Sequence, residues 1–249
     1  MRKRSRLAAS ARVRRFFSSS RHLFISSSRH LGTSAPRSAF VVATLLCLVV
    51  LSAAASSYFP EFYHVWKPSE GAWSTYRIVD ARGETAELTF SIVGKEGENY
   101  WLEIKTRQEG AEGTAAYLVS GDPSDDANVL MIRAQEQGQP AIEIDRATLA
   151  RLQTEGHKAF GGEATPIGPK VGKLEPLPDE TVKVSGKDLK CRHLKIAGPD
   201  QTAEIWLDDA VSPFGLVKLK SGMEEVVLLR YGTGAKPSLK GPFTPLAVP

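Results

Sequence analysis

The sequence predicts a mainly β protein: a curved antiparallel sheet, or half-barrel, of about ten strands with one or two short helices, preceded by an N-terminal signal or anchor helix. Three observations lead to this prediction. Short segments alternate apolar and polar residues, and turns rich in Gly, Pro, Asp and Asn separate them. A single stretch has helical spacing. An uncharged apolar run, Ala39–Ala55, follows a basic head.

The N-terminal part of the chain directs it to a membrane. Residues 1–38 are a basic head with ten Lys or Arg and no Asp or Glu, and residues 39–57 are expected to form an apolar signal or transmembrane helix. The positive-inside rule places the head in the cytoplasm and the following domain outside, so the membrane is a partner through Ala39 to Ala55 at least during export. Two outcomes remain open: cleavage after the small residues Ala53–Ala55, or retention as an anchor, favoured by the aromatic residues between 58 and 66.

The rest of the chain divides by composition. Residues 58–70 are a linker, 71–235 the β domain and 236–249 a Pro-rich tail. From Ser57 onward there are 22 Lys or Arg against 28 Asp or Glu, a net charge of −6, so the positive total of +4 comes from the head. We therefore expect no nucleic-acid partner.

Two neighbouring segments of the domain predict a hairpin. Glu84–Val93 and Asn99–Arg107 both alternate with a period of two, which is typical of half-buried strands, and a turn with two glycines joins them. Leu88, Phe90, Ile92, Tyr100, Leu102 and Ile104 are expected to be apolar-face residues, with Trp101, Glu103 and Lys105 facing the other way.

Eight further segments have the same character, and the last of them is apolar on both faces, which indicates a central position in the sheet. These strands are expected at Thr114–Ser120, Asn128–Ala134, Ala141–Ile144, Thr181–Ser185, Leu189–Ile196, Ala203–Leu207, Phe214–Leu219 and Glu224–Tyr231.

One helix is expected at Arg146–Gln153, where Leu149 and Leu152 lie three residues apart and Gly156 follows as a stop. Residues 156–178 are rich in Gly and Pro and are predicted to form a long loop. The Pro-rich tail is expected to be loosely ordered.

The cysteines and histidines offer little chemistry. Cys47 lies in the apolar run and Cys191 in the domain, so neither a disulfide nor a zinc framework is expected. Cys191 and His193 are two apart on a predicted strand, which is compatible with a thiolate–imidazole pair, but a lone strand cysteine is usually a small buried hydrophobe. His157 has no assignable partner.

Acidic residues cluster at two turns. Asp122, Asp125 and Asp126 have part of the spacing of a calcium loop but lack its full ligand set, so a polar turn is the simpler interpretation. Asp208 and Asp209 are adjacent on a strand end and point to opposite faces, which disfavours a catalytic dyad. We expect no metal site, no cofactor and no enzymatic activity.

The apolar strand positions have two interpretations, an ordinary core or an apolar cavity for a lipid chain on the inner side of a curved sheet. The cavity interpretation depends on the shortage of helices to cover that side. The lipid-facing candidates are Trp73, Phe90, Tyr100, Leu102, Ile104, Met131, Ile205, Leu207 and Leu219.

Several segments resemble envelope proteins of the superfamily of the lipoprotein-sorting carrier LolA. Val182–Cys191 is similar to their valine-rich strand followed by Gly and Cys, and Glu204–Lys218 is similar to their Trp, acidic turn and Gly-Leu-Val-Lys strand pair. Gly71–Tyr76 and Val93–Glu103 also resemble uncharacterised relatives, and the likeness extends over residues 71–232. The resemblance implies a half-barrel with an apolar concave side, which in the sorting carriers receives acyl chains.

Two functions follow as hypotheses. The first is a non-enzymatic envelope protein that binds a lipid or a lipoprotein acyl chain. The alternative is a membrane-anchored structural or protein-interaction module of the envelope without a lipid ligand. In both, the domain lies on the periplasmic side of the inner membrane, either anchored or released by cleavage near Ala55.

Overall fold

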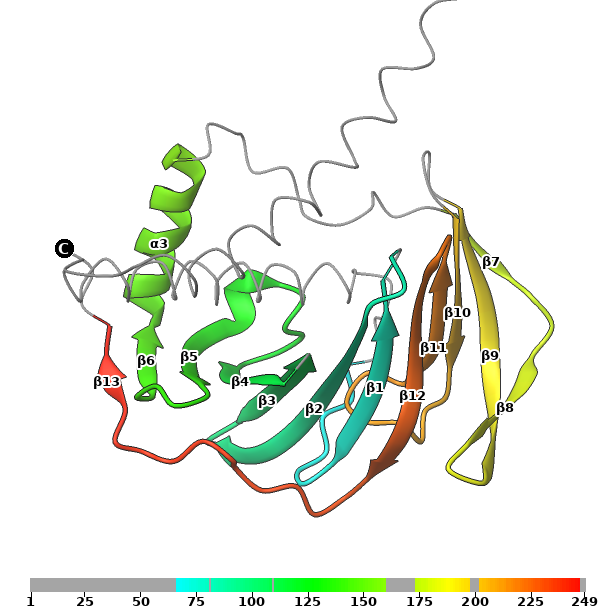
Figure 1. Ribbon diagram of the computed structural model, residues 1–249, viewed down its shortest axis with the longest axis horizontal. Helices are drawn as coiled ribbons and strands as arrows, with labels where there is room; N and C mark the ends of the chain where they lie inside the picture. The colour runs from blue at the N-terminus through cyan, green and yellow to red at the C-terminus, as the bar shows by residue number, and fades with distance from the viewer. Residues whose placement is uncertain (1–65, 81, 109, 160–172, 198–201, 247–249) are drawn as a thin grey trace, which may run out of the picture. The chain divides into compact units, whose positions relative to one another are not determined.

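A computed structural model describes residues 66–80, 82–108, 110–159, 173–197 and 202–246. The described chain is mainly β, with thirteen strands in one open, curved sheet (Figure 1). The strand order is β13-β6-β5-β4-β3-β2-β1-β12-β11-β10-β9-β7, and β8 pairs with β9 outside this path. All neighbouring strands are antiparallel except β13 and β6, which run parallel for two residues.

The first half of the sheet is a continuous up-and-down meander from β1 to β6. Their bounds are β1 Trp73–Val79, β2 Thr85–Glu96, β3 Asn99–Gln108, β4 Ala111–Val119, β5 Val129–Glu136, β6 Ile142–Asp145, β7 Lys173–Pro176, β8 Glu180–Val184, β9 Lys187–Ala197, β10 Thr202–Leu207, β11 Leu216–Ser221, β12 Glu224–Gly232 and β13 Thr244–Pro245.

The first meander has two chemically different faces. Register pairs Phe90 with Ile104 and Ile92 with Leu102, and Leu102 lies opposite Tyr117 on β4, so these apolar side chains share the concave face. The intervening residues, such as Glu103, share the convex face. Alternation along the strands separates the two sets, as the sequence predicts, and the register shifts at Ile92/Gly94 and Leu118/Val119 interrupt it locally.

Strand β12 connects the two halves of the sheet. It pairs with β1 through residues 225–232 and with β11 through residues 224–227. Its Val226 and Leu228 are buried, with 3 % of each residue exposed. The central position expected for this strand is confirmed.

A loop and a helix lie on the concave side (Figure 1). The loop 208–215 places Phe214 edge-on against Phe90, with ring centroids 5.2 Å apart, and against Trp66 at 5.5 Å. Buried residues from β1–β3, β8–β12 and this loop form one continuous core. Tyr76, with no exposed surface, donates its hydroxyl to the Leu216 carbonyl at 3.0 Å and so joins the core to the end of the loop.

The helix α3, Arg146–Ala159, begins directly after β6 and contacts β5 and β6. Asp145 caps its N-terminus by accepting the Thr148 N–H at 2.7 Å, a contact that holds the pKa of this carboxyl below its usual range. The stop expected at Gly156 is wrong, because the helix continues to Ala159. A single glycine inside a helix costs about 1 kcal/mol, which neighbouring turns offset.

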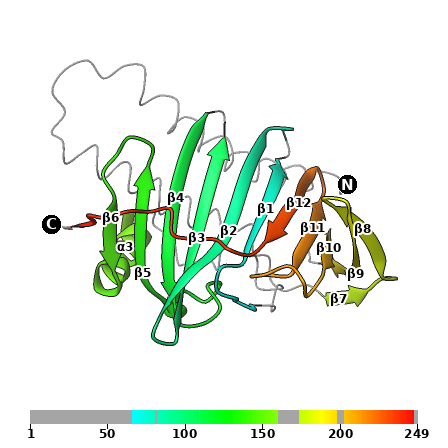
Figure 2. The same ribbon diagram turned by 90° about the horizontal axis from the view of Figure 1, so that it is seen from below.

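The C-terminal tail does not lie free of the sheet. Figure 2 shows that the tail runs from β12 across the convex face toward β6. Its strand β13 pairs there with β6. Thr244 and Leu246 donate backbone N–H groups to the carbonyls of Ala141 and Glu143. We call residues 236–246 the strap. The expectation of a loosely ordered tail is thus wrong for this part of the chain.

The prediction of a mainly β, curved sheet is confirmed, although three strands were missed. β1 begins right after the linker, β7 falls in the expected long loop, and β13 consists of two residues in the tail. The predicted signal or anchor helix, residues 39–57, lies outside the described residues. Among those described, none of the helices has the length and apolar character needed to cross a membrane.

Candidate functional site

Four of the nine lipid-facing candidates are core residues. Phe90, Leu102, Ile205 and Leu207 keep 1–3 % of their surface and pack within one cluster. Their burial is what the ordinary-core interpretation requires. A role in lipid contact therefore depends on the less buried positions around them.

Three other candidates surround this cluster. Tyr100, Ile104 and Leu219 are half-buried and pack against the core. Tyr100 also lies beneath the Lys95 ammonium, which is 4.6 Å from the ring centroid. These residues form the margin of the apolar concave surface.

Trp73 and Met131 lie on the other face. Trp73 is three residues from Tyr76 on β1, so their side chains point to opposite sides, and its indole N–H donates to the Thr233 carbonyl at 3.2 Å. A Cβ at Gly232 would lie 3.0 Å from the Trp73 ring, so a larger residue there would require the ring to shift. Met131 pairs with Leu118, next to the concave pair of Ile132 and Tyr117, so its side chain points to the convex face. The structure therefore divides the nine candidates between two faces.

Cys191 and His193 do not form a reactive pair. Cys191 has no exposed surface, its Sγ lies 3.7 Å from the Leu189 carbonyl, and burial raises the pKa of its thiol to about 11. His193 instead stacks on Trp206, with centroids 4.2 Å apart, and lies 3.2 Å from Glu204. A buried neutral thiol without an imidazole partner is a poor nucleophile.

The acidic turns are satisfied by local contacts. Asp122 accepts hydrogen bonds from the backbone N–H and hydroxyl of Ser124, and Asp208 accepts from the Ala210 N–H at 2.8 Å. Asp209 pairs with Lys67 at 2.9 Å. Within the described ranges, no group of three or more His, Cys, Asp or Glu is arranged to hold a metal ion. The side chain of His157 lies outside the described residues.

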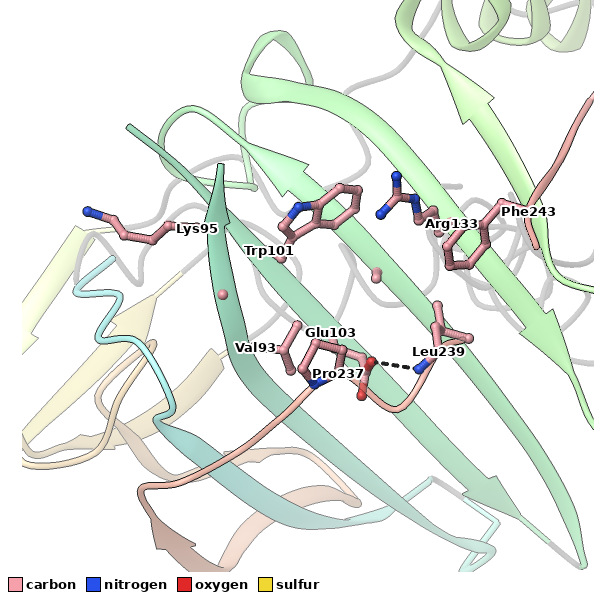
Figure 3. A pocket seen from close by; sticks show the side chains of 10 residues that line it. Val93, Lys95, Trp101, Glu103, Arg133, Pro237, Leu239 and Phe243 are labelled. Atoms are coloured by element: carbon pink, nitrogen blue, oxygen red, sulfur yellow. Dashed lines mark hydrogen bonds between the residues drawn. The ribbon is translucent and has the colours of Figure 1, made fainter. Parts of the chain in front are cut away.

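A cavity that the sequence did not predict lies on the convex face beneath the strap. Figure 3 shows it between β2, β3, β5 and the strap, and its volume is about 250 Å³. Most of its wall is aliphatic or aromatic. The lining residues are Val93, Gly94, Lys95, Trp101, Glu103, Ala116, Arg133, Pro237, Leu239 and Phe243.

Glu103 holds the strap over this cavity. Only 5 % of the residue is exposed, and its carboxylate accepts three hydrogen bonds. The Ser238 hydroxyl donates to Oε1 at 2.7 Å, while the Ser238 and Leu239 N–H groups donate to Oε2 at 2.9 Å and 3.4 Å. These donors are what make a buried carboxylate tolerable.

Arg133 is the second polar group of the cavity. Its guanidinium lies between the rings of Trp101 and Phe243, 4.4 Å and 4.5 Å from their centroids. Its Nε donates to Glu143 at 2.8 Å. The strap therefore supplies one of the two rings that hold this cation.

Sequence reasoning missed this site because it read the convex residues of β3 as solvent-facing. The unusual signal was Trp101 among charged residues on that face, next to a tail that carries Pro237, Leu239 and Phe243. Period-two alternation assigns residues to faces but does not show which distant segment covers a face.

Comparisons with known proteins leave the family open. No protein-family model matches the chain, and no curated protein matches it. Among solved structures, it is similar to a crystal structure of MucB with 14 % identity and a TM-score of 0.38, covering 71 % of this chain and 57 % of that one. It is similar to the MucA/MucB complex structure of Pseudomonas aeruginosa with 14 % identity and a TM-score of 0.35, covering 67 % and 53 %.

A third solved structure, PNGF-II, shows 10 % identity and a TM-score of 0.36 over 72 % of this chain and 31 % of that one. The chain spans little more than half the length of the MucB chains. These TM-scores are too low to establish a shared fold. The resemblance to the LolA superfamily stays a prediction.

Proposed function

We propose that this chain is a non-enzymatic protein of the cell envelope whose β domain binds an acyl chain of a lipid or lipoprotein on the concave face. The basic head and the apolar run support the location. The concave face supports the ligand class. The envelope location and the concave ligand are separate parts of the proposal, and each has its own support.

One observation carries the ligand class: the concave face of the first meander is apolar across five strands. On the concave face, the register of β2 to β6 aligns Ile92, Leu102, Tyr117, Ile132 and Ile144 in one apolar row. The same strands carry charged residues on the convex face, among them Lys105, Arg107, Glu112, Arg133 and Glu143. Four of the five residues in this row are buried, so an acyl chain on this face would contact the half-buried Tyr117 and the margin residues Tyr100 and Ile104.

The lack of enzymatic activity is part of the same proposal. Cys191 is buried with a raised thiol pKa, and the aspartates at the turns are engaged with backbone and side-chain donors. Binding rather than catalysis is therefore the function that the described side chains support.

The alternative is a membrane-anchored module that binds a protein on the same face. The burial of Phe90, Leu102, Ile205 and Leu207 favours it, because these side chains are already packed against the core. A partner would then contact the margin residues, such as Ile104, instead of entering a deep cavity.

Photo-crosslinking of the full chain in its native membrane separates the two. Benzoylphenylalanine replaces Ile104 on the concave face, and in the matched control it replaces Lys105, the next residue on the convex face. An acyl-chain ligand gives an Ile104-site peptide that gains the mass of a lipid, with no such adduct at Lys105. A protein adduct at the Ile104 site identifies the interaction module. No adduct at that site, or equal adducts at both sites, contradicts the proposal.

A further inference from the structure

The guanidinium of Arg133 is held in one orientation, and within the described chain its two Nη nitrogens donate no hydrogen bond. Stacking on Trp101 and Phe243 fixes the plane of the guanidinium, and the Nε bond to Glu143 fixes its rotation. Among the described residues, neither Nη nitrogen has a hydrogen-bond partner, and the Glu143 carboxylate is bound through Nε. The Arg133 side chain retains 29 % exposure, so part of it is open to solvent. A guanidinium prepared in this way matches the geometry of a carboxylate or phosphate.

The cavity beside it accommodates a compact apolar group. Val93, Ala116 and Leu239 contribute aliphatic wall, and the volume of about 250 Å³ is below the range of about 300–1,000 Å³ that is typical of ligand sites. A group of the size of a leucine side chain fits such a space, whereas a long acyl chain does not. Figure 3 shows Arg133 at the margin and the aliphatic wall beneath the strap.

The charges around the cavity favour an anion at the Arg133 end. Lys95 also lines the cavity, but its ammonium lies over the Tyr100 ring and points away from Arg133, so Arg133 is the cation that would contact the ligand. Glu103 is also in the lining, but three donors already occupy its carboxylate. Glu143 offsets part of the charge of Arg133, so the attraction comes from short hydrogen bonds and not from a strong long-range field.

We propose that the cavity beneath the strap binds a small organic anion, a carboxylate or phosphate monoester on a compact branched apolar group, through both Nη groups of Arg133. The site lies on the convex face and is independent of the acyl-chain site proposed above. Failure of either proposal leaves the other in place.

Calorimetric titration of the full-length chain in neutral detergent tests the site. The probes are 4-methylpentanoate, isobutyl phosphate and the uncharged 4-methylpentanamide. We expect at least one anion to bind with a dissociation constant on the order of 1 mM or tighter, and at least about tenfold more tightly than the amide. The ligand is assigned to the carboxylates if 4-methylpentanoate binds more tightly, and to the phosphate monoesters if isobutyl phosphate does.

Variants assign the binding to the guanidinium. Arg133→Gln removes the positive charge. Arg133→Lys keeps the charge but loses the planar pair of N–H donors that binds two oxygens at once. Each variant is expected to weaken anion binding at least about tenfold. The matched control is Arg107→Gln, which removes an exposed convex-face arginine paired with Glu112 and leaves binding unchanged.

Thermal melting of each variant reports whether it folds. If Arg133→Gln fails to fold, Arg133→Lys decides, and if both fail, the comparison of anion with amide on the wild-type chain decides. The proposal is overturned if neither anion binds at about 10 mM, if the amide binds equally well, or if the folded Arg133 variants bind as the wild type does.

Discussion

Ser238 is bound to Glu103 twice, through its hydroxyl at 2.7 Å and its backbone N–H at 2.9 Å, although 135 residues separate them along the chain. This contact joins the strap to the middle of β3. It converts a Pro-rich tail into part of the folded domain, and it encloses the cavity in which Arg133 lies.

Glu103→Gln is expected to release the strap. The amide loses the charge and replaces one acceptor with a donor that faces the Ser238 groups, so the free energy of unfolding falls by about 1.5–3 kcal/mol. Chemical denaturation measures this loss, and hydrogen exchange of residues 236–246 reports the release. The control Glu112→Gln removes exposed ion pairs and costs at most about 1 kcal/mol. Unchanged protection of the strap in Glu103→Gln contradicts the prediction.

Phe214→Ala is expected to destabilise the domain by about 3–5 kcal/mol. The side chain lies in the loop 208–215 and packs against Phe90 and Trp66, so its removal leaves a cavity over the concave face. The matched control is Met223→Ala, since that residue is 77 % exposed and its truncation changes stability by less than about 0.5 kcal/mol. Equal melting temperatures for the two variants would show that the loop does not stabilise the sheet.

Tyr76→Phe is expected to cost about 1–3 kcal/mol, because it leaves the buried Leu216 carbonyl without the phenol that donates to it. Tyr100→Phe serves as the control, since that residue is half-buried at the margin of the core. Denaturant titration of both variants measures the difference. A Tyr76→Phe variant as stable as the wild type shows that the hydrogen bond contributes nothing.

Alkaline pH is expected to destabilise the fold through Cys191. Burial raises the pKa of its thiol to about 11, above the value of about 8.5 in an unfolded chain. The folded state thus prefers the protonated thiol. The associated stability is complete below about pH 8.5 and is lost as pH rises toward about 11, with a loss of about 3 kcal/mol by that pH.

Unfolding free energies of the wild type and Cys191→Ala between pH 8 and 11 test this dependence. We expect the pH slope to flatten in Cys191→Ala and to stay unchanged in Cys47→Ala. Peptide-resolved alkylation at neutral pH gives a second measure, in which Cys191 stays unmodified in the folded chain. Fast modification of Cys191 under these conditions rules out the buried neutral thiol.

Local patterns were sufficient to predict the fold class and most strands. The alternation in Glu84–Val93 and Asn99–Arg107 predicted the β2–β3 hairpin, and its apolar set lies on one face as expected. The two-sided apolar character of Glu224–Tyr231 correctly indicated a central strand. These predictions succeeded because burial on one or both faces leaves a direct periodicity in the sequence.

The elements that were missed depend on distant contacts. β13 is two residues long and exists through its pairing with β6, a parallel contact over a separation of 102 residues between Thr244 and Ile142. The strap cavity likewise depends on the Glu103–Ser238 contact. In the candidate site, alternation placed Trp101, Glu103 and Lys105 on one face but gave no indication that a tail covers part of it.

The position of β12 governs the order in which the domain can be completed. β1 ends at Val79, and one of its two edges stays without its native partner until the segment Glu224–Gly232 has emerged from the ribosome or the export channel. Loop closure over such a separation is slow compared with hairpin formation. A chain truncated before Glu224 therefore leaves β1 as an unpaired edge of the β1–β6 sheet, which makes incomplete chains prone to aggregation.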